Sequence, residues 1–203
     1  MVVKALKQSS PGNIIVEFES GETLRSTLGA VTDARLYVGM ELDDEAFEEL
    51  RRDSSKALDR QKALELLSRR PYSRKEIYDK LLRRGASEQS AEDCVAWLSE
   101  HGFLDDGEYA GAVARHYTAK GYGAGRVKSE LRRRGIDREQ ADETLAELGE
   151  NTEKLDAYIA RRLVDPSDRD SVRKVSAALF RRGYSWEEIR AALRRFDGNI
   201  EED

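Results

Sequence analysis

Arginine pairs and triplets recur at three places in the chain, and guanidinium groups bind phosphates and carboxylates well. The runs are Arg83-Arg84, Arg132-Arg133-Arg134 and Arg181-Arg182. One interpretation is local, because a cation in the last turn of a helix is stabilised by the helix dipole. The other is a periodic basic ridge that faces phosphates or an acidic protein partner. The middle run favours binding, because residues 111–149 carry 8 basic and 6 acidic residues in a chain of net charge −5.

The middle segment contributes further candidates for such a surface. We expect Arg126, Lys128, Arg132 and Arg133 to share one exposed side of a single helix. Before them, residues 121–125 read Gly-Tyr-Gly-Ala-Gly, but this stretch follows a helix and lacks the Gly-Lys-Ser/Thr of a nucleotide-binding loop. We therefore interpret it as a flexible turn between helices. Tyr122 in this turn either stacks on a base or partner side chain, or covers the edge of the core.

Residues that could support catalysis or metal binding are few. Asp105-Asp106 resembles a carboxylate pair for acid–base chemistry, but its place before an amphipathic helix favours N-capping. Cys94, His101 and His116 are the only soft metal ligands, and their spacing does not match a zinc site. No Ser or Cys nucleophile is positioned beside either histidine. We expect no enzyme, no metal and no cofactor.

Several apolar residues are interpreted as packing residues. Cys94, Trp97 and Trp186 are expected to fill the core, since buried aromatics contribute mainly by burial. Phe103 and Leu104 are expected to staple the turn before the next helix to the core.

The composition limits the class of protein. Of 203 residues, 39% are hydrophobic and 37% are charged, and no apolar run approaches the roughly 18 residues that cross a bilayer. The first residues are too soon interrupted by charge for a signal peptide. A single cysteine cannot form an internal disulfide, so we expect a reducing, cytoplasmic location.

From residue 56 onward the pattern is helical and repeats three times. The aligned segments are Ile77–Gly85, Val127–Gly135 and Val175–Gly183. Each pairs an apolar residue with Leu four residues later, then ends in arginines and a glycine suited to a left-handed helix cap. An N-cap follows each glycine by two residues, at Ser87, Asp137 and Ser185, and Ser185 with Glu188 forms a capping-box pattern. With an amphipathic stretch ahead, each unit is a three-helix repeat of about 50 residues.

The first 56 residues differ from this pattern. Residues 14–18 and 23–26 are predicted to form a β-hairpin around Ser20-Gly21-Glu22, with a third strand at residues 2–6. Short helices follow from about Ala30 and over residues 43–52, and a further helix is expected over residues 58–67. This segment holds 7 basic and 11 acidic residues, so it is the most acidic part of the chain.

The predicted fold is mainly α. Tandem three-helix repeats stack into an elongated, curved body, with a small amino-terminal β-hairpin segment. The expected divisions are residues 1–56 for the amino-terminal segment, 57–105, 106–150 and 151–198 for the repeats, and 199–203 for an acidic tail. Residues 121–125 and Asp165-Pro166-Ser167-Asp168 are expected to loosen connections within the second and third repeats.

The sequence motifs within the repeats resemble those of the RecX family, the regulators of the RecA recombinase. The matching stretches are residues 63–67, Arg70-Pro71-Tyr72-Ser73-Arg74-Lys75-Glu76, Lys80-Leu81-Leu82-Arg83-Arg84-Gly85, Leu98, Gly102-Phe103-Leu104-Asp105-Asp106, Tyr109-Ala110, Lys120-Gly121-Tyr122-Gly123 and residues 131–136. The resemblance is good over residues 57–149, fair to 196 and weaker over the amino-terminal segment.

The resemblance implies a non-enzymatic regulator that binds RecA filaments on single-stranded DNA, and some relatives also bind DNA directly. It implies opposition to filament extension, net disassembly, and reduced ATP hydrolysis, strand exchange and co-protease activity. That would place the chain in homologous recombination, DNA repair and the SOS response. The expected partners are the RecA filament and single-stranded DNA, with double-stranded DNA as an alternative to the single strand. We expect a monomer with no membrane partner. The candidate contacts to RecA or DNA are Arg83, Arg84, Arg126, Lys128, Arg132, Arg133, Arg134, Tyr122, Arg181 and Arg182.

Two other functions remain open from the sequence. A stand-alone DNA-binding protein is the main alternative, because small three-helix units resemble helix-turn-helix modules. Against it, no second helix carries the Asn, Gln and Arg mixture that reads base edges, and the chain is acidic. An α-helical scaffold for an unrelated protein partner is the other.

Overall fold

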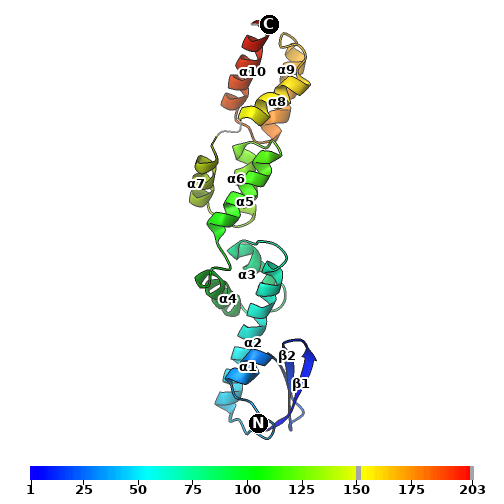
Figure 1. The fold of residues 1–203 in the computed structure, drawn as a ribbon, viewed down its shortest axis with the longest axis vertical. Coiled ribbons are helices and arrows are strands. Elements are labelled where there is room, and N and C mark those ends of the chain that lie inside the picture. The colour runs from blue at the N-terminus through cyan, green and yellow to red at the C-terminus, as the bar shows by residue number, and fades with distance from the viewer. Residues whose placement is uncertain (150–151, 202–203) are drawn as a thin grey trace. The chain divides into compact units, whose positions relative to one another are not determined.

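The computed structural model describes residues 1–149 and 152–201 as a mainly helical chain with one small sheet (Figure 1). It divides into two compact units, the first spanning Met1–Leu104 and the second beginning at Asp105. The mainly α class and the amino-terminal sheet agree with the sequence prediction. No helix in the described part of the chain is long and apolar enough to cross a membrane.

The amino-terminal segment begins with a three-stranded antiparallel sheet in the order β1-β2-β3. Its strands are β1 (Val3–Ser10), β2 (Asn13–Phe18) and β3 (Thr23–Thr27), which confirms the hairpin and the third strand. Alternate residues of β2 are buried, because successive side chains of a strand point to opposite faces. Val16 and Phe18 pack in a core with Phe47 and Leu50. The short helix α1 (Leu28–Asp33) follows, with Thr27 as its N-cap.

The next element is α2 (Asp44–Leu67), a single helix of 24 residues where the sequence predicted two. The predicted N-cap Asp43 is confirmed, since its carboxylate accepts the Ala46 amide at 2.8 Å. No Gly or Pro interrupts this stretch, so the helix continues through the expected boundary at residue 56. At Ser54 the polar side chain is satisfied, because its Oγ donates to Ser26 Oγ at 2.8 Å in a buried site.

The repeats are built from short helices around separate cores. The carboxyl-terminal half of α2 packs with α3 (Arg74–Leu82) and α4 (Glu88–Glu100). In the second unit, α5 (Asp106–Ala119), α6 (Ala124–Arg133) and α7 (Arg138–Leu148) enclose one core, and α8 (Thr152–Arg162), α9 (Arg169–Arg181) and α10 (Trp186–Glu201) another. The predicted boundary at residue 150 and the last two residues of the predicted acidic tail lie outside the described residues.

The turn after the middle helix of each repeat has the predicted geometry. Gly85, Gly135 and Gly183 adopt φ of 93°, 83° and 91°, a left-handed conformation that other residues adopt only at a cost. The next residue donates its amide back to a buried leucine carbonyl: Ala86 to Leu81 at 3.2 Å, Ile136 to Leu131 at 3.1 Å and Tyr184 to Leu179 at 3.3 Å. The predicted N-caps Ser87, Asp137 and Ser185 are confirmed, and Ser185 with Glu188 forms the capping box.

Two apolar predictions are wrong. Phe103 is 49% exposed and stacks on Trp97 with ring centroids 5.9 Å apart, so only Leu104 enters the core. Trp186 is 50% exposed at the start of α10, where its ring stacks on Phe180 at the surface. Cys94 is buried as predicted, and burial raises the pKa of its thiol to about 11.

The segment before α9 is an ordered turn and not a loose connection. Asp165 accepts the amide of Ser167 at 2.8 Å, and Asp168 accepts that of Asp170 at 3.0 Å as the N-cap of α9. Short side-chain caps of this kind hold a turn together without a core.

Candidate binding surface on the helical repeats

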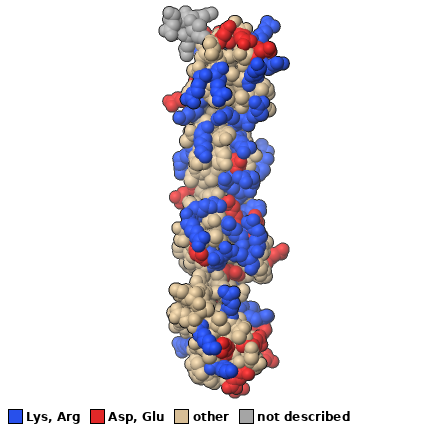
Figure 2. Space-filling model, turned by 90° about the vertical axis from the view of Figure 1, so that its right-hand side faces the viewer, with Lys and Arg blue, Asp and Glu red and all other residues tan. Residues whose placement is uncertain are grey.

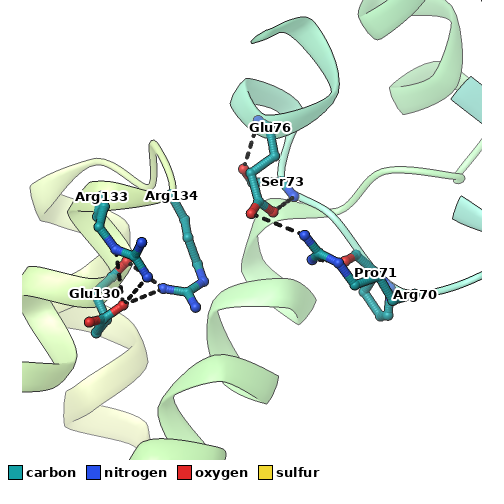
Figure 3. A network of polar contacts seen from close by, with 7 residues as sticks. All are labelled: Arg70, Pro71, Ser73, Glu76, Glu130, Arg133 and Arg134. Atoms are coloured by element: carbon teal, nitrogen blue, oxygen red, sulfur yellow. Dashed lines mark hydrogen bonds and ion pairs between the residues drawn. The ribbon is translucent and has the colours of Figure 1, made fainter. Parts of the chain in front are cut away.

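The arginines of the first repeat lie at the end of α3. Arg83 is exposed and its Nε donates to the carbonyl oxygen of Asp79 at 3.0 Å, so it caps the helix as the local interpretation expects. Arg84 is exposed beside it. Ahead of α3, Arg70 donates to the carbonyl of Pro71 at 2.9 Å and contacts Glu76 at 3.5 Å, beside the Ser73 capping box (Figure 3).

In the second repeat, three arginines of α6 and its end converge on one acid, Glu130. The Nη2 atoms of Arg126 and Arg133 lie 3.0 and 2.7 Å from its carboxylate, and Nη1 of Arg134 lies at 2.6 Å. Figure 3 shows Arg133 and Arg134 turned toward the same carboxylate. Glu130 is only 6% exposed, whereas Arg126 and Arg133 keep much of their side chains in solvent.

This arrangement fixes the charge of Glu130. Burial alone would raise its pKa, but hydrogen bonds from Arg133 and Arg134 outweigh that effect and lower the pKa to about 2. Burial likewise disfavours the charged form of Arg134, but the hydrogen bond to Glu130 leaves its pKa raised. Glu130 therefore holds the arginines in place as an anion throughout the physiological pH range.

Lys128 does not share a side with these arginines, contrary to the prediction. Residues advance about 100° each around a helix, so positions 126, 130 and 133 lie together and position 128 does not. Its Nζ lies 2.6 Å from the carboxylate of Asp142 on α7. Arg132 lies four residues after Lys128 and on its side of the helix, so the prediction is also wrong for Arg132. The Arg132 side chain is exposed and makes no hydrogen bond or ion pair with the described residues.

The glycine-rich stretch is a packing surface and not a flexible turn. The amide of Gly123 donates to Arg182 O at 3.0 Å, and that of Gly125 to Gly183 O at 2.9 Å. A Cβ at Gly123 would lie 2.5 Å from the Tyr184 nitrogen, and a Cβ at Gly183 would overlap the backbone of Arg126. The glycines are therefore needed for two backbones to approach closely.

Arg182 and Tyr122 belong to this internal contact. The Arg182 guanidinium donates to the carbonyl of Gly121 at 3.3 Å and lies 5.4 and 4.8 Å from the rings of Tyr122 and Tyr158. Tyr122 also packs on Tyr117, with centroids 5.6 Å apart. Both side chains thus join the second repeat to the third, and of the two interpretations of Tyr122 the structural one matches these contacts.

The predicted residues therefore separate into two sets. The exposed set is Arg83, Arg84, Arg126, Arg132, Arg133 and Arg181. The partly covered set, whose side chains are held by contacts within the chain, is Tyr122, Lys128, Arg134 and Arg182. On the face drawn in Figure 2, Lys and Arg side chains form broad patches on the repeats, and acidic side chains group on the amino-terminal segment and near the carboxyl-terminal end.

Sequence reasoning missed Glu130 and the aromatic pair of Phe180 and Trp186. Glu130 lies four residues after Arg126 and three before Arg133, spacings that place all three on one helix face. That signal was present in the sequence. The rings of Phe180 and Trp186 come from two helices and lie 5.0 Å apart, a contact that no periodicity indicates. The described residues contain no group of His, Cys, Asp and Glu that could hold a metal ion.

Comparison with known proteins decides the family. Family models described as the first and second three-helix domains of RecX match residues 60–98 and 105–145. The "Regulatory protein RecX" of Xanthomonas axonopodis pv. citri (strain 306) is 41% identical over 140 residues, which cover 68% of this chain and 86% of that protein. The chain belongs to the RecX family. The protein of the same name in Stenotrophomonas maltophilia (strain R551-3) is 36% identical over 137 residues, covering 66% and 84% of the two chains.

Solved RecX structures share the fold. A crystal structure of regulatory protein RecX aligns with TM-score 0.72 at 21% identity, covering 93% of this chain and 97% of that one. RecX from Lactobacillus salivarius aligns with TM-score 0.65 at 24% identity, covering 70% and 97%. The RecX matches thus include both the sequence of the first two repeats and a fold that extends over most of the chain.

Proposed function

We propose that this RecX protein regulates RecA by binding the RecA filament on single-stranded DNA. In this proposal it blocks filament extension or promotes disassembly, and so inhibits the recombinase, ATPase and co-protease activities of RecA in the cytoplasm. The observation that carries the proposal is the 41% identity to a regulatory RecX protein over 86% of that protein's length. The proposed partners are the RecA filament and its single-stranded DNA.

The exposed arginines are the proposed contact residues. Arg126 and Arg133 form ion pairs with the buried carboxylate of Glu130, and these pairs limit the positions that their guanidinium groups can take. Pre-organised guanidinium groups lose less entropy when they bind a carboxylate or phosphate. Arg132 and Arg181 project without such support. This surface suits an acidic partner or a phosphate backbone.

Direct binding to the filament tests the proposal. RecA filaments are assembled on a poly-dT oligonucleotide with a non-hydrolysable ATP analogue, and amino-terminally labelled protein is titrated with them in an anisotropy assay. We expect saturable binding that is much tighter than binding to the bare oligonucleotide. Equal affinity for bare DNA and for filament would favour the stand-alone DNA-binding alternative, and binding to neither by folded protein would contradict both.

A further inference from the structure

The third repeat carries an aromatic stack in which both rings are exposed. The rings of Phe180, near the end of α9, and Trp186, at the start of α10, lie 5.0 Å apart with an interplanar angle of 18°. Each side chain is 50% exposed. Two large stacked rings left half in water have no role in the core of the repeat, which is formed by Leu179, Tyr184 and Ile189 beside them.

Arginines continue this surface along α10. Arg190 and Arg194 follow Trp186 at intervals of four residues, so the three side chains form one stripe with about 6 Å between successive positions. Both arginines are exposed, and the Nε of Arg190 donates to the carbonyl of Trp186 at 3.2 Å. Arg181 adds a further exposed cation next to Phe180.

The acidic residues of the first turn of α10 do not face this stripe. Glu187 and Glu188 line a small pocket of about 270 Å³ together with Thr152 and Leu155 of α8. The carboxylate of Glu188 is also held by the amide of Ser185 at 2.6 Å. The stripe from Trp186 to Arg194 therefore carries two cations, whereas Glu187 and Glu188 lie toward α8. Asp197, an exposed acid three residues after Arg194, ends the stripe.

The same positions are occupied differently in the other repeats. Counting from the turn glycines, Phe180 corresponds to Arg132 of the second repeat and Leu82 of the first, and Trp186 to Arg138 and Glu88. The aromatic pair is therefore specific to the third repeat and is not a requirement of the repeat fold. In the second repeat these positions are two exposed arginines.

We propose that Phe180 and Trp186 form a stacking platform for the unpaired bases of single-stranded DNA, with the phosphates on Arg190 and Arg194. Aromatic faces stack on any base, and a flanking row of cations follows the backbone, which is the combination that sequence-independent single-strand binders use. Duplex DNA does not fit the platform, because its bases are already stacked within the helix. The inference rests on the proposed function, to which it adds a direct contact with the strand on which the filament forms.

The tryptophan itself reports on the contact. Replacing Trp97 by Phe leaves Trp186 as the only tryptophan of the chain. A 20-nucleotide dT oligomer is expected to quench its emission, because a stacked base lies against the indole. An abasic oligomer of the same length offers the same phosphates without bases and is expected to bind without quenching.

Substitutions separate stacking from charge. With labelled oligomers, Trp186→Ala is expected to weaken dT binding about tenfold, as for the loss of one stacking contact, and to leave abasic binding unchanged. Trp186→Phe keeps an aromatic face and is expected to retain most of the affinity. Val164→Ala, at a residue that is 94% exposed elsewhere in the same repeat, is the matched control and is expected to change neither affinity.

Two results would overturn the platform: absence of quenching by dT in folded protein, or an equal loss of dT and abasic binding in Trp186→Ala. Circular dichroism of each variant shows that it is folded. These measurements contain no RecA. If the platform fails while the chain still binds RecA filaments, the proposed function stands and only the stacking contact is wrong.

Discussion

The backbone amide of Gly125 donates a 2.9 Å hydrogen bond to the carbonyl oxygen of Gly183. The two glycines belong to different repeats of the second unit, and the neighbouring pair of Gly123 and Arg182 forms a parallel bond at 3.0 Å. Arg182 then covers the junction by donating to the Gly121 carbonyl. A stretch that has the composition of a flexible turn is thus the place where two repeats meet backbone to backbone.

Gly183→Ala is expected to break this junction. Its φ of 91° already disfavours a side chain, and the new methyl group would overlap the backbone of Arg126. Gly85→Ala is the matched control, because Gly85 has φ of 93° and open space around it. We expect the free energy of unfolding to fall by about 1–2 kcal/mol in the control and by about 3 kcal/mol or more in Gly183→Ala.

Hydrogen exchange locates the damage. In Gly183→Ala the amides of Gly123 and Gly125 should lose their protection, whereas in Gly85→Ala they should keep it. Retained protection of both amides in the Gly183 variant would show that the close approach of the backbones is not needed to hold the repeats together.

The lowered pKa of Glu130 predicts that the second unit loses stability in acid. Its pKa in the folded chain is lowered from 4.5 to about 2, so folding gains from the ionised form. This contribution is fully present above pH 4.5 and is lost as the pH falls toward 2. The free energy of unfolding, measured in urea at pH 6, 4 and 3, should therefore decline with falling pH, and it should decline less in Glu130→Gln than in the unaltered protein.

At neutral pH, Glu130→Gln is expected to lower the free energy of unfolding by about 2–4 kcal/mol. The change removes the carboxylate that pairs with the largely buried guanidinium of Arg134. The matched control is Glu147→Gln on α7, at an exposed residue, which should change stability by less than about 0.5 kcal/mol. An unchanged pH profile in the Glu130 variant would contradict the assigned role.

Charge reversal tests the exposed arginines. Arg132→Glu combined with Arg181→Glu should weaken filament binding at least tenfold, since both side chains are exposed and each reversal replaces attraction by repulsion. Stability should change little, because neither arginine is ion-paired with the described residues. Arg25→Glu on β3 is an exposed control outside the repeats. Equal affinities for all three proteins would place the contact elsewhere.

The acidic amino-terminal segment offers a separate test. Asp33, Glu49 and Asp53 line one groove of about 960 Å³ beside α1 and α2, and none is ion-paired with the described residues. If this segment meets a basic surface of RecA, the triple change to Asn, Gln and Asn should lower filament affinity and leave single-stranded DNA affinity unchanged. Equal changes in both affinities, or none in either, would argue against that contact.

Local signals in the sequence sufficed for the repeats but not for their junctions. Periodicity and spacing over one or two helical turns predict the turn glycines, the N-caps and buried pairs such as Ile77 and Leu81. The docking of Gly123 on Arg182 joins residues 59 apart in the chain, so composition alone suggested flexibility. Trp186 was assigned to the core because large aromatics usually are buried, and only the packing of α9 and α10 shows that its ring is exposed.

The most direct test of the central claim is the single-strand-dependent ATPase activity of the cognate RecA, titrated with this protein. We predict inhibition at protein well below the RecA concentration, because one molecule that blocks filament extension silences several RecA subunits. Inhibition that needs equal amounts would indicate binding along the filament or competition for DNA. Full ATPase activity in the presence of excess folded protein would contradict the proposal that this chain regulates RecA.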